Sequence, residues 1–232
     1  MNPTSTNEKR RAATLLRRST LFRTLPPAAI ARLAAGSTTL ELLRGEQLFR
    51  CGERCAGLYT VLTGRIANSV GARSGPSKVI DLVGPGGNIG LASVVLGANH
   101  NVTADALTDS TLTLTPQATL SACCSSVPEL WPQLAIALSR QVCGLITDVA
   151  AFSLSSGRER VAHYLLEMTS TQAAREHPVT LPATKSIIAS RLNLTPEYFS
   201  RMLHELIADG AIAVNGRHIT VIDPARLRDC RH

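Results

Sequence analysis

Aromatic side chains are scarce in this chain of 232 residues, since Phe, Trp and Tyr together make up only 3% of it. Hydrophobic residues as a whole make up 44%, which is enough apolar surface for a real core. That core must therefore be built mostly from Leu, Val, Ile and Ala. The length suits one large domain or two modest ones.

Inspection of the sequence also shows no long hydrophobic run. No apolar run approaches the roughly 18 to 20 residues that are needed to span a bilayer. The basic N-terminus is not followed by the apolar segment of a secretory signal. We therefore expect a cytoplasmic protein with no membrane partner, in which the six cysteines are reduced thiols rather than a disulfide framework.

The usual signatures of catalysis are absent as well. The chain has no nucleophile elbow, no His-Glu-x-x-His, no P-loop and no closely spaced set of zinc ligands, so we do not expect an enzyme. The net charge of +7 is basic, but the first 23 residues hold six Lys and Arg against one acidic residue. Most of the excess thus lies in an expected disordered tail, residues 1–13, and the helical segment after it. Charge alone does not identify nucleic acid as a partner.

Two patterns divide the rest of the chain. Residues 14–35 are predicted to form two short helices with a break at Pro26-Pro27. From 38 to 115, short runs rich in Val, Ile, Leu and Thr alternate with glycines, which favours an antiparallel sandwich or barrel. Residues 58–66 are typical of two strands around a turn.

A long helix is predicted from 128 to 154. Its apolar residues alternate at spacings of four and three, the heptad pattern of a coiled coil, and we interpret them as the seam of a parallel homodimer. The alternative is a helix packed on its own domain. A hinge is expected at 153–157, followed by a further amphipathic helix over 158–168. The seam residues are Trp131, Ala135, Leu138, Val142, Leu145, Val149 and Phe152.

Residues 184–208 fit a helix-turn-helix. Asn193 occupies the turn, where Asn tolerates a left-handed backbone. Thr195 is a suitable N-cap and Pro196 a suitable first residue for the second helix. Apolar residues fill the positions that hold two such helices together: Ile188, Ala189, Leu192, Leu194, Phe199 and Met202.

An Asn215-Gly216 pair between two apolar runs, 211–214 and 218–222, predicts a hairpin wing after the second helix. The first turns of that helix would enter the major groove of DNA. Arg donates to guanine and Glu accepts from cytosine, so a Glu and an Arg on one face can read neighbouring G·C pairs. The alternative is a surface ion pair four residues apart. Candidate DNA-binding residues are Glu197, Tyr198, Ser200 and Arg201, with Arg217 at the wing tip as a phosphate contact.

With these elements in order, the chain resembles the CRP/FNR superfamily of bacterial regulators from about residue 15 to 228. Its Pro196-Glu-Tyr-Phe-Ser-Arg-Met202 resembles the FNR branch, including the DNR-like regulators, which have Pro-Glu-Thr-Phe-Ser-Arg. The resemblance implies an α+β fold: a β-roll sensor domain over 14–127, a dimerisation helix and hinge over 128–155, and a winged helix-turn-helix over 156–232. It also implies a palindromic operator of the TTGAT-N4-ATCAA kind, and RNA polymerase as a partner if the protein activates transcription.

The resemblance leaves the signal open. Segment 90–102 lacks the Glu and Arg with which cAMP-binding members hold ribose and phosphate, so cAMP is not expected. No Cys precedes Cys51, so an N-terminal iron–sulfur cluster is not expected either. His100 falls near the place of the phosphate-binding Arg and is a candidate haem ligand, as in nitric-oxide or carbon monoxide sensing. The candidate redox thiols are Cys51, Cys55, Cys123, Cys124 and Cys143. A DNA-binding repressor whose β-roll senses nothing is the alternative.

Overall fold

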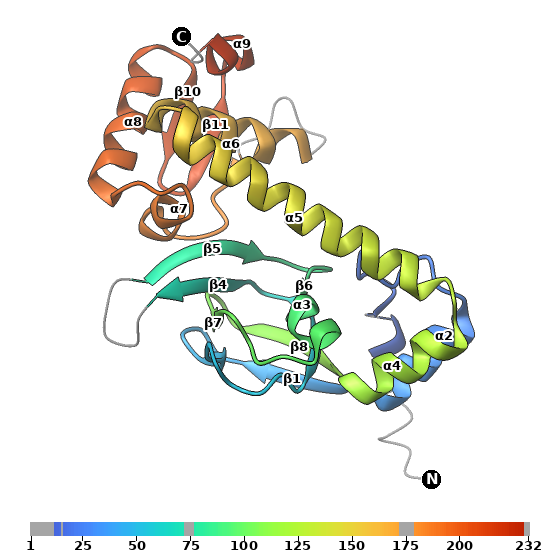
Figure 1. Ribbon diagram of the computed structural model, residues 1–232. Helices are drawn as coiled ribbons and strands as arrows, with labels where there is room; N and C mark the ends of the chain where they lie inside the picture. The colour runs from blue at the N-terminus through green and yellow to red at the C-terminus, as the bar shows by residue number, and fades with distance from the viewer. Residues whose placement is uncertain (1–11, 15, 72–76, 172–178, 230–232) are drawn as a thin grey trace. The chain divides into compact units, whose positions relative to one another are not determined.

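The computed structural model describes residues 12–14, 16–71, 77–171 and 179–229. The chain forms two compact units, Met1–Val142 and Cys143–His232, and the division falls inside one long helix (Figure 1). Most of the expected tail lies outside the described residues. Ala12 and Ala13 were expected in that tail, but Ala12 is buried in the core of the first unit and Ala13 packs against it.

The first unit contains two antiparallel sheets of four strands, with strand orders β1-β8-β3-β6 and β2-β7-β4-β5 (Figure 1). A core that includes Phe49, Val61, Ile66 and Leu112 draws side chains from both sheets, as expected of a sandwich or barrel. The strands are β1 (Thr38–Leu42), β2 (Gln47–Phe49), β3 (Gly57–Thr63), β4 (Ile66–Gly71), β5 (Ser77–Val83), β6 (Asn88–Ile89), β7 (Thr103–Ala106) and β8 (Ser110–Pro116). The predicted pair of strands within 58–66 is confirmed: the segment contains nearly all of β3, a turn, and the start of β4.

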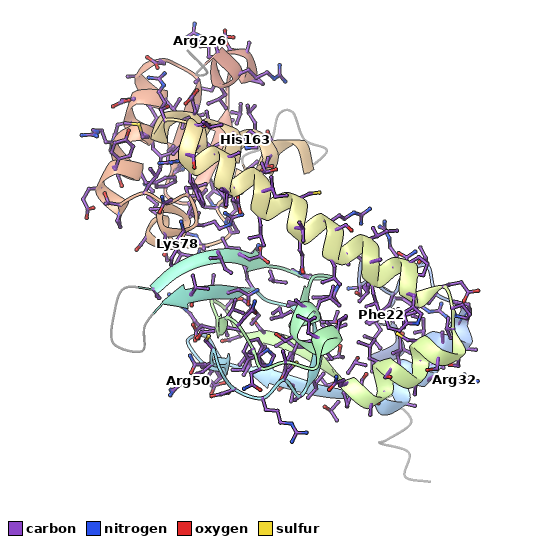
Figure 2. All side chains as sticks on the ribbon, in the orientation of Figure 1. Phe22, Arg32, Arg50, Lys78, His163 and Arg226 are labelled. Carbon is purple, nitrogen blue, oxygen red and sulfur yellow. The ribbon has the colours of Figure 1, made fainter. Side chains whose placement is uncertain are left out.

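Helices α2 (Pro27–Gly36) and α4 (Gln117–Ser126) pack beside the sheets with the start of α5 (Leu130–Leu154), and α3 (Leu91–Leu96) follows β6. Phe22, labelled in Figure 2, is completely buried in the second core that these helices share. The helix expected before Pro26 is wrong for residues 17–25, which form turns. Pro27 begins α2 because a missing N–H costs nothing in the first helical turn.

Helix α5 matches the long helix expected from the heptad pattern. Leu130 and Leu134 are buried, whereas most of its other apolar side chains are exposed. By length and composition alone, α5 is long and apolar enough to cross a membrane, and it is the one such helix among the described residues. The expectation that the chain contains no stretch of this kind is therefore wrong. Arg140 and Asp148 interrupt it, and Asp148 pairs with Arg191 of its own unit at 2.8 Å.

The second unit holds helices α6 (Gly157–Thr171), α7 (Lys185–Arg191), α8 (Pro196–Ala208) and α9 (Pro224–Arg228) with a small sheet. That sheet has the order β10-β11-β9, from strands β9 (Val179–Thr180), β10 (Ile212–Asn215) and β11 (His218–Val221). Ser156 and Glu159 form a reciprocal cap at the start of α6: the Glu159 carboxylate accepts from the Ser156 N–H, and Ser156 Oγ accepts from the Glu159 N–H at 3.2 Å. The chain therefore leaves α5 at Leu154 and starts a new helix within three residues.

Candidate nucleic-acid interface

The turn between α7 and α8 forms as the sequence predicts. Asn193 has φ 57°, the left-handed conformation expected at this position. The Thr184 side chain accepts from the Ile187 N–H at the start of α7, and Thr195 accepts from the Tyr198 N–H at 3.2 Å at the start of α8. Pro196 is the first residue of α8. These local features fix where both helices begin.

Helix α8 has one apolar side and one exposed side. Phe199, Met202, Leu203 and Leu206 are buried between the helices of the second unit. Glu197 and Arg201 are exposed and Ser200 is half-buried, so all three lie at the accessible N-terminal half of the helix. The burial of one side thus sets which side chains can meet DNA.

The alternative ion pair between Glu197 and Arg201 does not form. In the described part of the chain, Arg201 instead places its guanidinium over the Tyr198 ring, 4.6 Å from the ring centroid. Such stacking is favourable and holds a planar guanidinium in one orientation. Both charged groups remain available to a partner.

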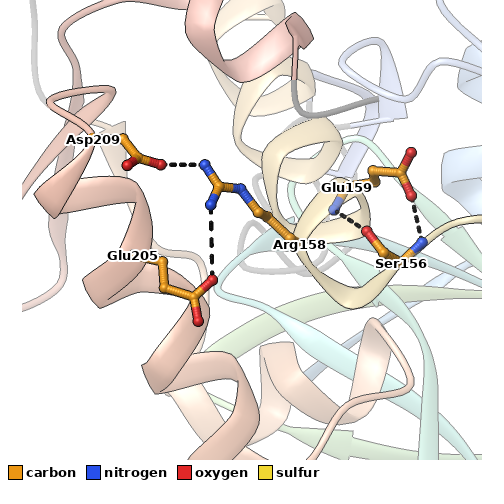
Figure 3. Close-up of polar contacts among 5 residues, drawn as sticks. All are labelled: Ser156, Arg158, Glu159, Glu205 and Asp209. Carbon is orange, nitrogen blue, oxygen red and sulfur yellow. Dashed lines mark hydrogen bonds and ion pairs between the residues drawn. The ribbon is translucent and has the colours of Figure 1, made fainter. Parts of the chain in front are cut away.

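The first residues of α6 contact both ends of α8. At one end the Tyr198 ring lies against Gly157, so that a Cβ on Gly157 would collide with Tyr198 Cε1 and lie 3.0 Å from Leu194 Cδ2. At the other end Arg158 pairs with Asp209, and with Glu205 at 3.8 Å (Figure 3). Sequence reasoning missed this clamp, because no local pattern joins residues that lie some fifty positions apart.

The wing differs from the expected turn. Asn215 pairs with His218 across β10 and β11, so the two-residue turn is Gly216-Arg217 rather than Asn215-Gly216. Gly216 supplies the positive φ of 62° that such a turn requires at its first position. The Arg217 guanidinium donates through one nitrogen to the Leu181 carbonyl at 2.9 Å, while the residue as a whole is exposed.

The expected seam of α5 is exposed over most of its length. Trp131, Val142, Leu145 and Val149 expose 52% to 64% of their surface, and Ala135 is exposed too. Leu138 packs partly against the core of the first unit, and Phe152 is half-buried beneath Arg160. The alternative interpretation, a helix packed on its own domain, thus applies to the first turns of α5 but not to its middle.

His100 lies inside the first unit. The residue is only 2% exposed, and its imidazole stacks on the Phe49 ring, with the centroids 3.5 Å apart. Neither ring nitrogen has a hydrogen-bond partner among the described residues. Burial lowers the pKa of His100, against a smaller opposite effect of Glu53, so the ring is neutral. The backbone of His100 pairs with Gly52 and Glu53, which brings the loop of Cys51 and Cys55 beside it.

The five cysteines in the described part of the chain fall into two groups. Cys51 and Cys143 are exposed. Cys123 and Cys124 are buried and Cys55 is half-buried, and burial raises the pKa of all three thiols, which keeps them protonated and poorly reactive. No three His, Cys, Asp or Glu side chains gather to hold a metal ion in the described residues.

Comparison with known proteins agrees with this geometry. Residues 39–126 match the family model of a cyclic nucleotide-binding domain, and residues 159–230 match that of a Crp-like helix-turn-helix domain. The chain is 26% identical over 181 residues to the fumarate and nitrate reduction regulatory protein of Escherichia coli, covering 77% of this chain and 72% of that one. This chain belongs to the CRP/FNR family of transcription regulators.

Solved structures show the same fold. FixK2 of Bradyrhizobium japonicum superposes with a TM-score of 0.77 at 24% identity, over 84% of this chain and 98% of that one. A CRP/FNR family regulator of Thermus thermophilus gives a TM-score of 0.67 at 24% identity, over 84% and 98%. The expected β-roll, long helix and C-terminal helix-turn-helix are thereby confirmed for this CRP/FNR regulator.

A haem ligated by His100 does not fit the residues as they lie in this CRP/FNR regulator. Both ring nitrogens are enclosed, so an iron atom would reach neither of them unless the side chains around the ring moved. The parallel Phe49 ring covers one face of the imidazole, and Gly90 approaches its edge. What His100 offers here is a buried, unpartnered imidazole rather than an open coordination position.

The contact between Gly157 and Tyr198 gives a first prediction. Gly157→Ala should destabilise the second unit by about 1–3 kcal/mol, because the new methyl group overlaps the Tyr198 ring. Gly144→Ala is the matched control: its Cβ meets nothing within 4 Å on an exposed stretch of α5, so it should stabilise by about 0.5–1 kcal/mol. Urea unfolding monitored by circular dichroism measures both, and equal effects would contradict the contact.

The lowered pKa of His100 gives a second prediction. An unfolded His gains a proton below its ordinary pKa of 6.5, whereas folded His100 resists protonation. Its contribution to stability is therefore complete above that pH and is lost as the pH falls below it. His100→Phe, which keeps a stacked ring, should flatten the fall in unfolding free energy between about pH 7.5 and pH 5.5. A slope unchanged by His100→Phe would refute the assignment.

Proposed function

We propose that this CRP/FNR regulator binds DNA as a homodimer at a palindromic, TTGAT-like operator and responds to a small signal other than cAMP. The observation that carries the proposal is the exposed group of Glu197, Ser200 and Arg201 at the start of α8, on a helix whose opposite side is buried. The second helix of a helix-turn-helix presents this region to the major groove.

Base reading follows from the chemistry of these three side chains. Arg201 can donate two hydrogen bonds to a guanine, and Glu197 can accept one from a cytosine of the same or the next pair. By resemblance to the FNR branch, these two residues read the central G·C pair and Ser200 reads a flanking thymine. Tyr198 stands where the resembling motif has Thr, and its ring supports Arg201. Arg217 is a weaker candidate, because its guanidinium is engaged by Leu181.

A second copy of the chain is the proposed partner of α5. Val142, Leu145 and Val149 present an exposed apolar stripe at heptad spacing, and such a stripe is stabilised when a partner helix covers it. Two copies related by a twofold axis would place two α8 helices on half-sites about one helical turn of DNA apart. Operator symmetry would then match protein symmetry.

The candidate signals are nitric oxide, carbon monoxide and redox change. Segment 90–102 contains no Arg, Lys or Glu, so a cyclic nucleotide phosphate would find no cation there. Enclosure of both His100 nitrogens weighs against a haem route. Among the described residues, the accessible redox groups that remain are the exposed thiols of Cys51 and Cys143. Cys143 is next to Val142 of the seam, so its oxidation would act directly on the helix pair.

A regulator that senses nothing in its β-roll is the second candidate. It is favoured by the filled interior between the sheets, where Phe49, Val61, Ile66 and Leu112 are each at most 4% exposed. Operator binding measured with reductant and with oxidant separates the two. Unchanged affinity with either treatment and with either gas would leave the second candidate standing.

The base-reading role predicts the behaviour of two Arg201 variants. Arg201→Ala should cost roughly 1–3 kcal/mol per half-site contact and relax discrimination at the contacted G·C pair. Arg201→Lys keeps the charge but loses the bidentate geometry, so it should retain affinity for unrelated DNA and lose discrimination. Titrations of operator and base-substituted duplexes at one fixed salt concentration measure both effects. Wild-type discrimination in Arg201→Ala would show that the assignment is wrong.

The proposed seam leads to a prediction about oligomeric state, tested with a second pair of variants. Leu145→Glu should convert the dimer to a monomer, because two like charges would face each other in an apolar seam. Ile136→Glu is the matched control, since Ile136 is 43% exposed but lies on another side of α5. Sedimentation analysis at several concentrations measures the oligomeric state of both variants. A dimer that persists in Leu145→Glu but dissociates in Ile136→Glu would place the interface on another side of α5.

A further inference from the structure

The half-buried ring of Tyr198 contacts two groups that belong to different helices. Arg201, three residues later and therefore on the same side of α8, places its guanidinium carbon 4.6 Å from the ring centroid. The ring also lies against Gly157, the first residue of α6, where an added Cβ would overlap Cε1 and lie 3.0 Å from Cζ. One ring thus connects the start of α6 to a side chain that we propose reads a base.

The backbone at Gly157 is held in place by its neighbours. Ser156 and Glu159 cap each other at the start of α6, and Arg158 pairs with Asp209 (Figure 3). Gly157 itself is buried and does not have a positive φ, so its backbone does not require glycine. Since glycine is unfavourable inside a helix, the space that it leaves for the ring is the feature gained here.

The orientation of the Arg201 guanidinium decides what the side chain can read. Two donors must meet the O6 and N7 atoms of one guanine together, which a freely rotating side chain seldom achieves. Stacking on a ring restrains the guanidinium before DNA arrives, so less freedom is lost on binding. Without the ring, Arg201 would be free to pair with Glu197 four residues earlier, and each would then occupy the other.

We propose that Tyr198 is a positioning residue for base recognition: its ring, held against Gly157, orients the Arg201 guanidinium for bidentate donation to guanine. This inference rests on the proposed function, in which Arg201 reads a G·C pair, and adds the residue that determines how selectively it does so. Phosphate contacts supply most of the affinity for unrelated DNA. A displaced ring would therefore lower discrimination between sequences and leave that general affinity nearly unchanged.

The stack can be tested in the full-length protein without DNA. The ring current of Tyr198 should shift the Hδ resonances of Arg201 upfield in ¹H–¹³C spectra of arginine-labelled protein. Tyr198→Phe keeps the ring and should keep this shift, whereas Tyr198→Leu keeps an apolar side chain without a ring and should abolish it. Arg201 Hδ resonances that are the same in wild type and in a folded Tyr198→Leu would overturn the proposal.

Discrimination is measured with three duplexes at one fixed salt concentration: TTGAT-N4-ATCAA, the same duplex with the contacted G·C pair replaced, and an unrelated sequence. Tyr198→Leu should lower the ratio of the first two affinities roughly two- to fivefold, the equivalent of a cation–π contact at an exposed site. Its affinity for the unrelated duplex should stay the same. Tyr198→Phe should keep the wild-type ratio. In an Arg201→Ala background, Tyr198→Leu should lower the ratio no further, because the two side chains act together.

Gly157 provides a second test away from the base-reading residues. A folded Gly157→Ala should lower the discrimination ratio, because the new methyl group moves the Tyr198 ring. Combined with Tyr198→Leu it should add little, since no ring remains to be moved. Gly144→Ala is the matched control and should keep the wild-type ratio, because its Cβ meets nothing within 4 Å.

The outcomes separate this inference from the proposed function. If Arg201→Ala loses discrimination while a folded Tyr198→Leu or Gly157→Ala keeps it, the positioning role is wrong and base reading by Arg201 stands. Equal losses in Tyr198→Phe and Tyr198→Leu would assign the effect to the hydroxyl group and also overturn the role of the ring. If wild type does not distinguish the duplexes, or Arg201→Ala distinguishes them as well as wild type does, both the inference and the proposed base reading are wrong.

Discussion

Burial of the apolar side of α8 is the interaction on which the second unit depends. Phe199, Met202 and Leu206 are each at most 4% exposed, and their burial against neighbouring helices fixes the rotation of α8 about its own axis. Once that rotation is set, Glu197 and Arg201 have to face outward. The surface that we propose to read bases is thus a consequence of core packing, and Tyr198 adds to it by supporting the Arg201 guanidinium.

The first turn of α6 connects this packing to the hinge. Gly157 accommodates the Tyr198 ring because it lacks a side chain, and Arg158 holds the far end of α8 through Asp209 and Glu205. A change in the direction of α6 would therefore act on α8 at both of its ends. These contacts provide a physical route by which a movement of α5 would reach the residues proposed to read bases, which is what the proposed allosteric response requires.

Helix α5 both packs against the first unit and presents an exposed apolar stripe. Its first turns bury Leu130 and Leu134 in the core of the first unit, while its middle leaves Val142, Leu145 and Val149 exposed. In water such a stripe is unfavourable unless another apolar surface covers it. Length and composition alone would equally suit a membrane span. The heptad spacing and the ion pair of Asp148 with Arg191 favour a helix partner in water.

Local chemistry determined much of this protein from its sequence: the helix-turn-helix, its Asn193 turn, the extent of α5 and the glycine-punctuated strands all depend on neighbours in the chain. The sequence did not determine the non-helical course of residues 17–25, the true wing turn, or the engagement of Arg217 by Leu181. Nor did it reveal that His100 is enclosed against Phe49, or that Arg160 Nε is buried without a hydrogen-bond partner among the described residues. Tertiary structure decided these features because each depends on which distant residues pack together, and packing competes with, and here overrides, local preference.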